Sequence, residues 1–354
     1  MTTNSRWMQL ALQQAQQADY TTWQNPRVGA VIVKDQRVLA AGHTQAYGGW
    51  HAERVALAQV APDQLRGATL YVTMEPCNHY GKQPPCTDLI IQAGVTKVVI
   101  AQRDPHQLVA GKGIRYLQAH GLAVEVGVLA TVAEHVNPHY NHYYRQHRPW
   151  ITLKQAMSLD GKVAAAPGVR TPITNSAAKQ RVHVERAWFH GIVIGSQTAL
   201  VDDPQLTTTA PTANPPVRIV IDRRGRLADR PQLQLLTDGA APTWIFTCAP
   251  QLKVQLAASK ATVYYRPQWP LSAVVTECGR QGLQALYVEG GPRLHQAFWD
   301  QGLVDEVITY LSPRMLGQTG VAGFQAHTPW QPGTVAYEVF GDNIRITERM
   351  SKNV

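Results

Sequence analysis

Cysteine is scarce in this sequence, with four residues in a chain of 354. The N-terminus lacks the unbroken apolar stretch of a signal peptide, and no apolar run reaches the length of a transmembrane helix. We therefore expect a cytoplasmic protein with no membrane partner, in which cysteines stay reduced. Paired cysteines in such a protein indicate metal ligands or reactive thiols, and not disulfides.

The sequence also lacks a long basic run, although 33 Lys and Arg against 24 Asp and Glu give a net charge of +9. The short cluster RRGR at 223–226 is the densest. Net charge alone constrains function weakly, and without a basic tail or an aromatic stripe we expect no nucleic-acid partner. The absence of a fixed-period repeat excludes solenoids and propellers. No Gly-x-Gly-x-x-Gly follows a predicted strand, which argues against a Rossmann domain.

The length of the chain suggests two domains. In the first part, apolar residues at helical spacing predict a helix over 7–18, and an apolar hairpin follows over 28–43. Strands and helices then alternate, which is typical of a layered α/β domain with a largely parallel sheet. The expected helices are 51–60, 87–93 and 113–120, and the expected strands are 68–73, 97–101 and 124–128.

The segment NPHYNHYYRQHRP at 137–149 interrupts the apolar periodicity, and we place the domain boundary there, between residues 1–145 and 146–354. Its histidines lack the spacing with a carboxylate that a metal site needs, which favours a boundary segment. A second α/β alternation follows. Its expected strands and turns are 150–157, 191–195, 217–222, 243–248, 261–266, 285–291, 306–311 and 343–350, with helices at 176–189, 271–281 and 293–301.

Three potential metal ligands occur in the first domain. His51 opens the expected helix 51–60, and Cys77 and Cys86 follow the expected strand 68–73. One imidazole and two thiolates suit a tetrahedral Zn²⁺ whose fourth position is left to water. His79 is a candidate fourth ligand for a closed structural site, but Glu53 beside His51 favours an open catalytic site.

His-x-Glu followed by Pro-Cys and a second cysteine is the signature of hydrolytic zinc deaminases, in which the glutamate transfers protons and does not bind the metal. Nucleic-acid and nucleoside deaminases usually carry Pro-Cys-x-x-Cys, whereas Cys77 and Cys86 enclose the longer NHYGKQPP. The adjacent prolines restrict this loop, so Lys82 is a candidate ligand for an anionic substrate group. The alternative for Lys82 is a solvated loop tip.

Together with DPHQLVAGKG at 104–113 and SLDGK at 158–162, these motifs resemble the bifunctional deaminase/reductases of riboflavin biosynthesis over nearly the whole chain. The long EPC…PPC loop separates that family from cytidine, guanine and tRNA adenosine deaminases. The resemblance implies a cytidine-deaminase-like α/β/α domain followed by a dihydrofolate-reductase-like α/β domain. It also implies one zinc ion per chain, NADPH as cofactor and a phosphorylated pyrimidine as the small-molecule partner, and we expect a homo-oligomer.

In this family the first domain hydrolyses an amino group from the diaminohydroxyphosphoribosylaminopyrimidine, and the second reduces the ribosyl side chain to ribityl with NADPH. The resemblance makes His51, Cys77 and Cys86 the zinc ligands and Glu53 the proton shuttle. It places three residues around the deaminase substrate: Asn25, Lys82 and Asp104.

In the second domain the resemblance assigns the reductase substrate to Arg186, Asp202, Leu206 and Glu289, and we add Arg170 as a candidate substrate-binding cation. It assigns the cofactor to Ala156, Pro172, Thr198, Asp202, Arg223, Gly291, Pro292, Arg293, Leu294, His295, Gln296 and Ala297. The residues themselves support the last group, because a strand, Gly-Gly-Pro and a helix leave free N–H groups that can bind a phosphate.

Three positions depart from the family pattern: Thr44 replaces a histidine, Pro172 a tryptophan and Thr209 an arginine. The zinc chemistry is unaffected, but the reductase pocket lacks an aromatic wall and a cation, for which Arg170 or Arg181 are candidate substitutes. The alternatives are a deaminase with a degenerate reductase domain, a nucleoside or nucleic-acid deaminase with an unrelated second domain, and a zinc-stabilised binding protein. The intact proton shuttle argues against the last of these.

Overall fold

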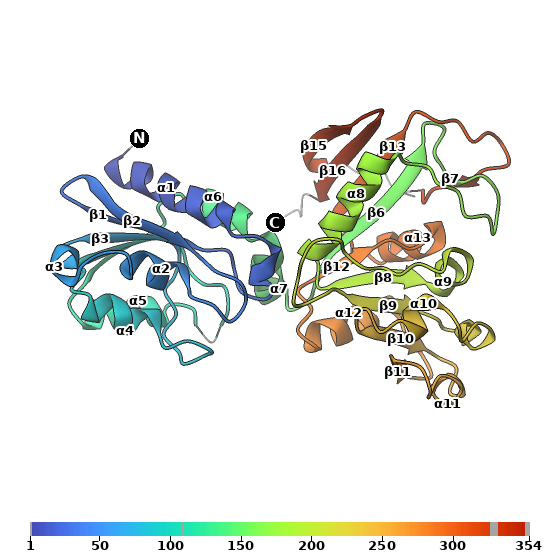
Figure 1. Cartoon of the computed structure of the whole chain (residues 1–354), viewed down its shortest axis with the longest axis horizontal. Coiled ribbons are helices and arrows are strands. Elements are labelled where there is room, and N and C mark those ends of the chain that lie inside the picture. The colour runs from blue at the N-terminus through green and yellow to red at the C-terminus, as the bar shows by residue number, and fades with distance from the viewer. Residues whose placement is uncertain (1, 108, 326–331, 351–354) are drawn as a thin grey trace. The chain divides into compact units, whose positions relative to one another are not determined.

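The computed structural model describes residues 2–107, 109–325 and 332–350 (Figure 1). They form two compact units, Met1–His147 and Arg148–Val354, and each unit contains its own sheet with its own helices. In the described residues, no helix is both long enough and apolar enough to cross a membrane.

The first unit is built on a five-stranded sheet in the order β2-β1-β3-β4-β5. The strands are β1 (Gly29–Lys34), β2 (Arg37–His43), β3 (Thr69–Met74), β4 (Lys97–Gln102) and β5 (Ala123–Val126). Strand β1 is antiparallel to both β2 and β3, and only the β3–β4 and β4–β5 pairs are parallel. The sheet is therefore mixed: the expected hairpin is antiparallel, and the expected parallel arrangement holds for β3, β4 and β5 but not for the pair β1–β3. A tight turn at Asp35 and Gln36, both with positive φ, reverses the chain between β1 and β2.

Helices cover both faces of this sheet, which gives the expected α/β/α layers. The helices are α1 (Thr3–Gln17), α2 (Ala52–Leu57), α3 (Pro62–Leu65), α4 (Cys86–Gln92), α5 (Lys112–Ala119), α6 (Ala130–Val136) and α7 (Pro138–Gln146). Alternation along β1 places Val31 and Val33 against α1 and α6, and Ile32 against α2, α4 and α5. The close approach of α1 requires a glycine, because a Cβ at Gly29 would lie 1.9 Å from the Ala11 carbonyl oxygen.

Helix α7 corrects the interpretation of residues 137–149 as a segment without periodic structure. Pro138 occupies the first helical position, where its missing N–H costs nothing. The buried residues of α7 are the polar Asn141 and His142. The Asn141 amide donates to the Glu134 carbonyl oxygen at 3.0 Å, and its Oδ1 accepts from the Gln102 amide at 3.1 Å. The helix packs through hydrogen bonds, so its apolar periodicity is absent.

The second unit contains a nine-stranded sheet in the order β11-β10-β9-β8-β12-β6-β13-β16-β15. The strands are β6 (Trp150–Ser158), β8 (Gly191–Gly195), β9 (Val217–Ile221), β10 (Thr243–Thr247), β11 (Ala261–Tyr265), β12 (Ala285–Val288), β13 (Glu306–Ser312), β15 (Pro332–Phe340) and β16 (Asn343–Met350). The pairs from β11 to β13 are parallel, and β16 is antiparallel to both of its neighbours. Strand β15 was not expected from the sequence. A separate small ladder joins β7 (Lys162–Ala164) to β14 (Val321–Ala322).

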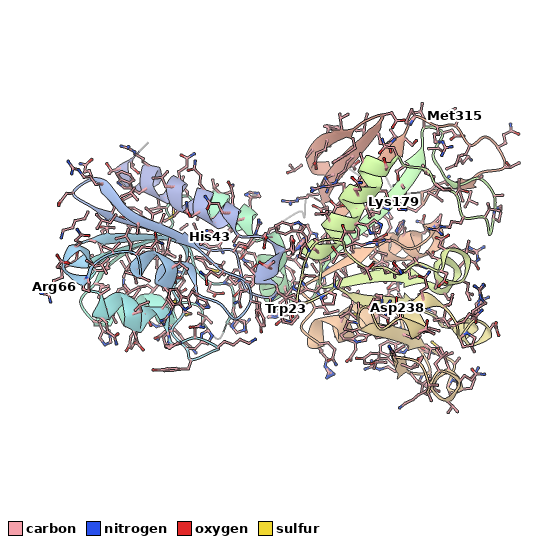
Figure 2. The ribbon with its side chains drawn as sticks, in the orientation of Figure 1. Trp23, His43, Arg66, Lys179, Asp238 and Met315 are labelled. Atoms are coloured by element: carbon pink, nitrogen blue, oxygen red, sulfur yellow. The ribbon has the colours of Figure 1, made fainter. Side chains whose placement is uncertain are left out.

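Helices α12 (Leu271–Arg280) and α13 (Pro292–Asp300) cover one face of this sheet. The other face is covered by α8 (Ser176–Glu185), α9 (Ser196–Asp202), α10 (Gln234–Thr237) and α11 (Leu252–Gln255). The expected helix 176–189 ends at Glu185 and continues as a 3₁₀ turn, η2 (Arg186–Trp188). Lys179 lies on the exposed face of α8 (Figure 2). Parallel strands end at a common sheet edge, so the loops after β6, β8, β9 and β12 share one edge.

Candidate functional site

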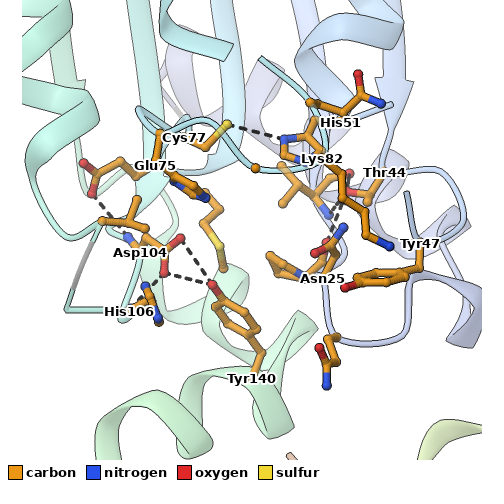
Figure 3. Close-up of a pocket in the computed structure, with 18 of the residues that line it drawn as sticks. Asn25, Thr44, Tyr47, His51, Glu75, Cys77, Lys82, Asp104, His106 and Tyr140 are labelled. Atoms are coloured by element: carbon orange, nitrogen blue, oxygen red, sulfur yellow. Dashed lines mark hydrogen bonds between the residues drawn. The ribbon is translucent and has the colours of Figure 1, made fainter. Parts of the chain in front are cut away.

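His51, Cys77 and Cys86 lie together in the first unit, with all their possible ligand atoms within 4.8 Å of one another. His51 caps α2, Cys77 lies on the loop after β3, and Cys86 is the first residue of α4. Nδ1 of His51 is 3.5 Å from the Cys77 Sγ (Figure 3). It is 3.4 Å from the Cys86 Sγ. This donor set fits a tetrahedral zinc ion that leaves one position open.

Hydrogen bonds hold the loop between the two cysteines. The backbone N–H of Cys86 donates to the Cys77 Sγ at 3.4 Å, and that of Thr87 donates to the Cys77 carbonyl oxygen at 3.3 Å. The hydroxyl of Thr87 donates to the Asn78 side chain at 2.8 Å. The hydrogen bond between the two thiols lowers the pKa of Cys77 and raises that of Cys86, because they retain one proton between them. A cation bound here would therefore displace a proton.

Glu53 lies in the first turn of α2 and lines the same pocket as His51, with 4% of its surface exposed. Burial raises its pKa to about 7, although the neighbouring His51 opposes the shift. A carboxyl group with a pKa near neutrality can both accept and donate a proton at physiological pH, which suits a general acid/base.

Glu75 is a residue of this region that the sequence did not single out. Its buried carboxylate accepts N–H groups from Asp104 at 3.3 Å, Gly111 at 2.9 Å and Ile114 at 3.2 Å. It therefore ties the chain after β4 and the start of α5 to the loop that carries Cys77. The signal was its place in Glu-Pro-Cys, where a glutamate directly precedes the metal-binding loop.

A cavity of about 500 Å³ opens beside the three potential metal ligands. It is lined by the three residues expected around the substrate, Asn25, Lys82 and Asp104, together with His51 (Figure 3). Glu53 lines it as well. The first 102 residues contribute most of this lining, and α7 contributes two tyrosines. The structure thus brings the expected deaminase positions into one pocket.

Lys82 is solvent-exposed but lies against an aromatic ring. Its Nζ is 3.9 Å from the centroid of the Tyr47 ring, an attractive cation–π geometry. The neighbouring Gln83 amide donates to the Gly48 carbonyl oxygen at 3.2 Å. These two contacts dock the long loop between the cysteines on residues 47–48 and hold its cation at the pocket, which argues against a freely solvated loop tip.

Thr44 replaces the family's histidine and is buried. Its hydroxyl donates to the Pro26 carbonyl oxygen at 3.1 Å and accepts the Val28 N–H at 2.9 Å. The residue therefore fixes the chain directly after Asn25, which lines the pocket. Compared with the family pattern, this position therefore lacks an imidazole, but its hydroxyl holds the backbone of residues 26–28 beside the pocket.

Asp104 follows β4 and is 8% exposed. Burial raises its pKa to about 6, and hydrogen bonds from the His106 N–H at 2.8 Å and the Tyr140 hydroxyl at 3.1 Å limit the shift. Tyr140 belongs to α7, so it was missed because that segment was interpreted as a boundary.

Arg186 and Glu289, both expected at the reductase substrate, form a buried ion pair in the second unit. Nε and Nη2 of Arg186 donate to the two carboxylate oxygens at 2.6 and 2.9 Å, and Nη1 donates to the Thr207 carbonyl oxygen at 2.8 Å. Burial alone would raise the pKa of Glu289, but Arg186 lowers it to about 2. Lys154 on β6 was not anticipated. Burial lowers its pKa, and the charge of Glu289 opposes that change, which places the two groups near each other.

Two of the other expected reductase positions, Leu206 and His295, have side chains buried in the second unit, and four others lie close together in pairs. Thr198 and Gly291 approach each other, since a Cβ on Gly291 would lie 3.6 Å from the Thr198 hydroxyl. Burial raises the pKa of Asp202 and the nearby charge of Arg170 opposes it, so these two residues are also close. Leu206 is packed in the core, with a positive φ of 51°. The buried side chain of His295 donates to the Val288 carbonyl oxygen at 3.0 Å, so the ring is turned toward the core.

The remaining expected cofactor positions are distributed over neighbouring segments. Ala156 lies on β6, Arg223 follows β9, and residues 292–297 form the start of α13. Gly291 caps α13, and Pro292 at its first position has no N–H. The N–H groups of Leu294 and His295 donate to the Gly291 carbonyl oxygen at 2.9 and 3.2 Å, so among the described contacts the N–H of Arg293 is the one left for a ligand in this first turn. The Pro172 carbonyl oxygen accepts Nη1 of Arg314 at 2.6 Å.

Two family profiles match this chain: the cytidine and deoxycytidylate deaminase zinc-binding region at residues 1–102, and the RibD C-terminal domain at residues 149–332. The riboflavin biosynthesis protein RibD of Bacillus amyloliquefaciens is 39% identical over 319 residues, which are 88% of this chain and 85% of that protein. RibD of Escherichia coli K12 is 37% identical over 326 residues, 88% of each chain.

Solved structures agree. The structure of Acinetobacter baumannii RibD, form 1, is 34% identical and covers 99% of both chains with a TM-score of 0.87. The Thermotoga maritima diaminohydroxyphosphoribosylaminopyrimidine deaminase/5-amino-6-(5-phosphoribosylamino)uracil reductase is 31% identical, with a TM-score of 0.84 over 98% of this chain and 99% of that one. The alternative of a deaminase with an unrelated second domain is thereby not favoured. The chain belongs to the RibD family, the bifunctional enzymes of riboflavin biosynthesis that join a zinc-binding deaminase domain to a reductase domain.

Proposed function

We propose that the first unit hydrolyses an amino group of the diaminohydroxyphosphoribosylaminopyrimidine, and that the second unit reduces the ribosyl side chain of the product with NADPH. The observation that carries the first activity is the cluster of His51, Cys77 and Cys86 with the buried Glu53 beside it. The second activity is supported by family membership and by the charged residues at the carboxyl edge of the large sheet.

In the deaminase pocket, one zinc ion bound by His51, Cys77 and Cys86 would lower the pKa of a water molecule at its open position. With zinc bound, Glu53 would accept a proton from water as the water oxygen bonds to the carbon that carries the amino group. It would then deliver a proton to that amino group, so that the C–N bond breaks and ammonia leaves. Asn25 and Asp104 bind the pyrimidine and its ribose. Lys82, held at the pocket over Tyr47, attracts the phosphate. A cavity of about 500 Å³ suits a small molecule of this kind.

In the reductase, NADPH would supply a hydride to the ribosyl carbon. The positive N-terminal end of α13 and the N–H of Arg293 suit one of its phosphates, with the Thr198 hydroxyl beside Gly291. Arg186 fixes the orientation of the Glu289 carboxylate through two hydrogen bonds. We assign the proton that accompanies the hydride to Lys154, which lies on β6 and whose pKa burial lowers.

The test follows ammonia release and NADPH oxidation separately on the same sample. We expect both activities, with about one zinc ion per chain, as for a single three-ligand site. Glu53→Gln should keep its zinc and lose about 10²- to 10⁴-fold in ammonia release, the range for loss of a general acid/base. The matched control Glu134→Gln alters an exposed carboxylate on α6 and should behave as wild type.

Two outcomes would contradict parts of this proposal. Loss of zinc in Glu53→Gln would assign Glu53 to metal binding and not to proton transfer. Ammonia release without NADPH oxidation would support the alternative of a degenerate reductase, as Pro172 and Thr209 suggested.

A further inference from the structure

The hydroxyl of Tyr140 reaches the deaminase pocket from α7, outside the matched zinc-binding region of residues 1–102. It lies 3.1 Å from Oδ1 and 3.3 Å from Oδ2 of Asp104, and both residues line the pocket. Figure 3 shows the tyrosine opposite the loop after β4, with its hydroxyl directed at this carboxylate.

The other hydrogen bonds of Asp104 involve backbone N–H groups. Its own N–H donates to Glu75, and its Oδ1 accepts the N–H of His106 at 2.8 Å. The other titratable groups whose charges act on it are Glu75 and His79. Among the described residues, Tyr140 supplies the side-chain hydrogen bond that the structure records for Asp104.

We propose that Tyr140 is a positioning residue of the deaminase, which orients the Asp104 carboxylate so that Oδ2 can accept a hydroxyl of a ribose-bearing substrate. This inference rests on the proposed function, because it assumes that Asp104 contacts the substrate. A carboxylate offers about four acceptor positions. The donors at Oδ1 fix the rotation of the group. Within the described part of the chain, Oδ2 has the longer contact to Tyr140 alone and so retains acceptor capacity toward the pocket.

The ring of Tyr140 is held independently of its hydroxyl. Its centroid is 4.7 Å from that of Tyr144, which in turn packs edge-on against His106 at 4.3 Å. Replacement by phenylalanine therefore retains the packing of α7 and removes only the hydrogen bond to Asp104. Tyr143→Phe is the matched control, because Tyr143 lies on the same helix and is not among the residues lining the pocket.

The kinetic test compares Tyr140→Phe with wild type and with Tyr143→Phe. We expect Tyr140→Phe to keep its zinc and its kcat, while KM for the pyrimidine rises about tenfold, as for loss of one hydrogen bond to a charged group. Removing the donor destabilises the charged form of a carboxyl whose pKa is already raised to about 6, so the pKa rises further. Glu53, with a pKa of about 7, titrates on the same acid limb of kcat/KM, so the raised pKa of Asp104 should make that limb steeper and move it to higher pH in Tyr140→Phe alone. Unchanged KM and acid limb would overturn the inference.

A second measurement needs no substrate. In protein labelled with ¹³C at aspartate carboxyl groups, the Asp104 resonance is assigned by its loss in Asp104→Asn and titrated in wild type and Tyr140→Phe. A higher pKa in Tyr140→Phe supports the positioning contact, and an unchanged pKa overturns it whether or not the protein deaminates. Absence of ammonia release from wild type, with the shift present, would instead count against the proposed function.

Discussion

At the scale of single residues, the buried pair of Arg186 and Glu289 makes a stability prediction. Both side chains are about 10% exposed or less, and the Nε–Oε1 distance is 2.6 Å. Glu289→Ala leaves a guanidinium buried without its partner, so the free energy of unfolding of the second unit should fall by about 3–5 kcal/mol. Urea denaturation measures this change. The control Arg280→Ala removes an exposed guanidinium 3.6 Å from Glu277, which keeps its second partner Arg266 at 3.4 Å, and should cost less than about 1 kcal/mol.

The same pair also predicts a pH dependence. Arg186 lowers the pKa of Glu289 to about 2 against the effect of burial, whereas an unfolded glutamate titrates near about 4.3. A lowered folded-state pKa means that the stabilisation is complete above the unfolded value and is lost as pH falls through the folded value. Wild type should lose stability between about pH 4 and pH 2 more steeply than Glu289→Gln, which cannot titrate there. Parallel pH profiles for the two proteins would contradict the role of this pair.

The metal cluster could be predicted from the sequence because zinc is bound by only a few residue types, chiefly cysteine and histidine. His51, Cys77 and Cys86 are separated by up to 35 positions in the sequence. An imidazole and two thiols in such a motif have few other common functions than metal binding in a protein whose cysteines are reduced. Glu75 and Tyr140 could not be found in this way. Their roles are hydrogen bonds to Asp104 and to its neighbouring backbone, and any buried glutamate or tyrosine can make such bonds.

At the scale of elements, apolar patterning predicted the strands and helices that pack through apolar contacts, including β3, β12 and α12. It failed for α7, where Asn141 and His142 are the buried residues. It also failed for β15, which is an edge strand of the described sheet and pairs with β16. Its apolar residues Tyr337 and Val339 are exposed, so the alternation of apolar residues along β15 does not correspond to a buried face. The antiparallel pairing of β1 with β3 joins segments about 40 residues apart. The apolar periodicity within each segment cannot predict which strands pair or in which direction.

The packing of α5 against the Cys77 loop makes a prediction at this scale. A Cβ at Gly113, in the first turn of α5, would lie 2.1 Å from the Pro76 carbonyl oxygen. Gly113→Ala should therefore push this loop away from α5 and displace Cys77, which weakens zinc binding. Zinc content after dialysis measures the effect. Gly81→Ala is the control, because its Cβ would meet nothing closer than His79 Nε2 at 3.7 Å, and equal zinc retention by both variants would contradict the argument.

At the scale of the whole molecule, each unit contains its own hydrophobic core. The clusters around Ile32 and Val31 belong to the first unit, and those around Val288, Ile194 and Tyr310 belong to the second. Two separate cores are expected to unfold in two thermal transitions. A ligand that binds only one folded unit should raise the transition temperature of that unit alone. At a ligand concentration of 100 times the dissociation constant, the free energy of unfolding of that unit rises by about 2.7 kcal/mol.

Scanning calorimetry with and without a zinc chelator tests this expectation. Removing zinc should lower the transition of the first unit, where the cluster of His51, Cys77 and Cys86 holds the β3–α4 loop to α2, and leave the second unchanged. Adding NADPH should raise only the second transition, which Glu289→Ala identifies by lowering it. His51→Ala should abolish the response to the chelator and retain the response to NADPH. A single transition that moves with either ligand would show that the two units unfold together and would contradict this prediction.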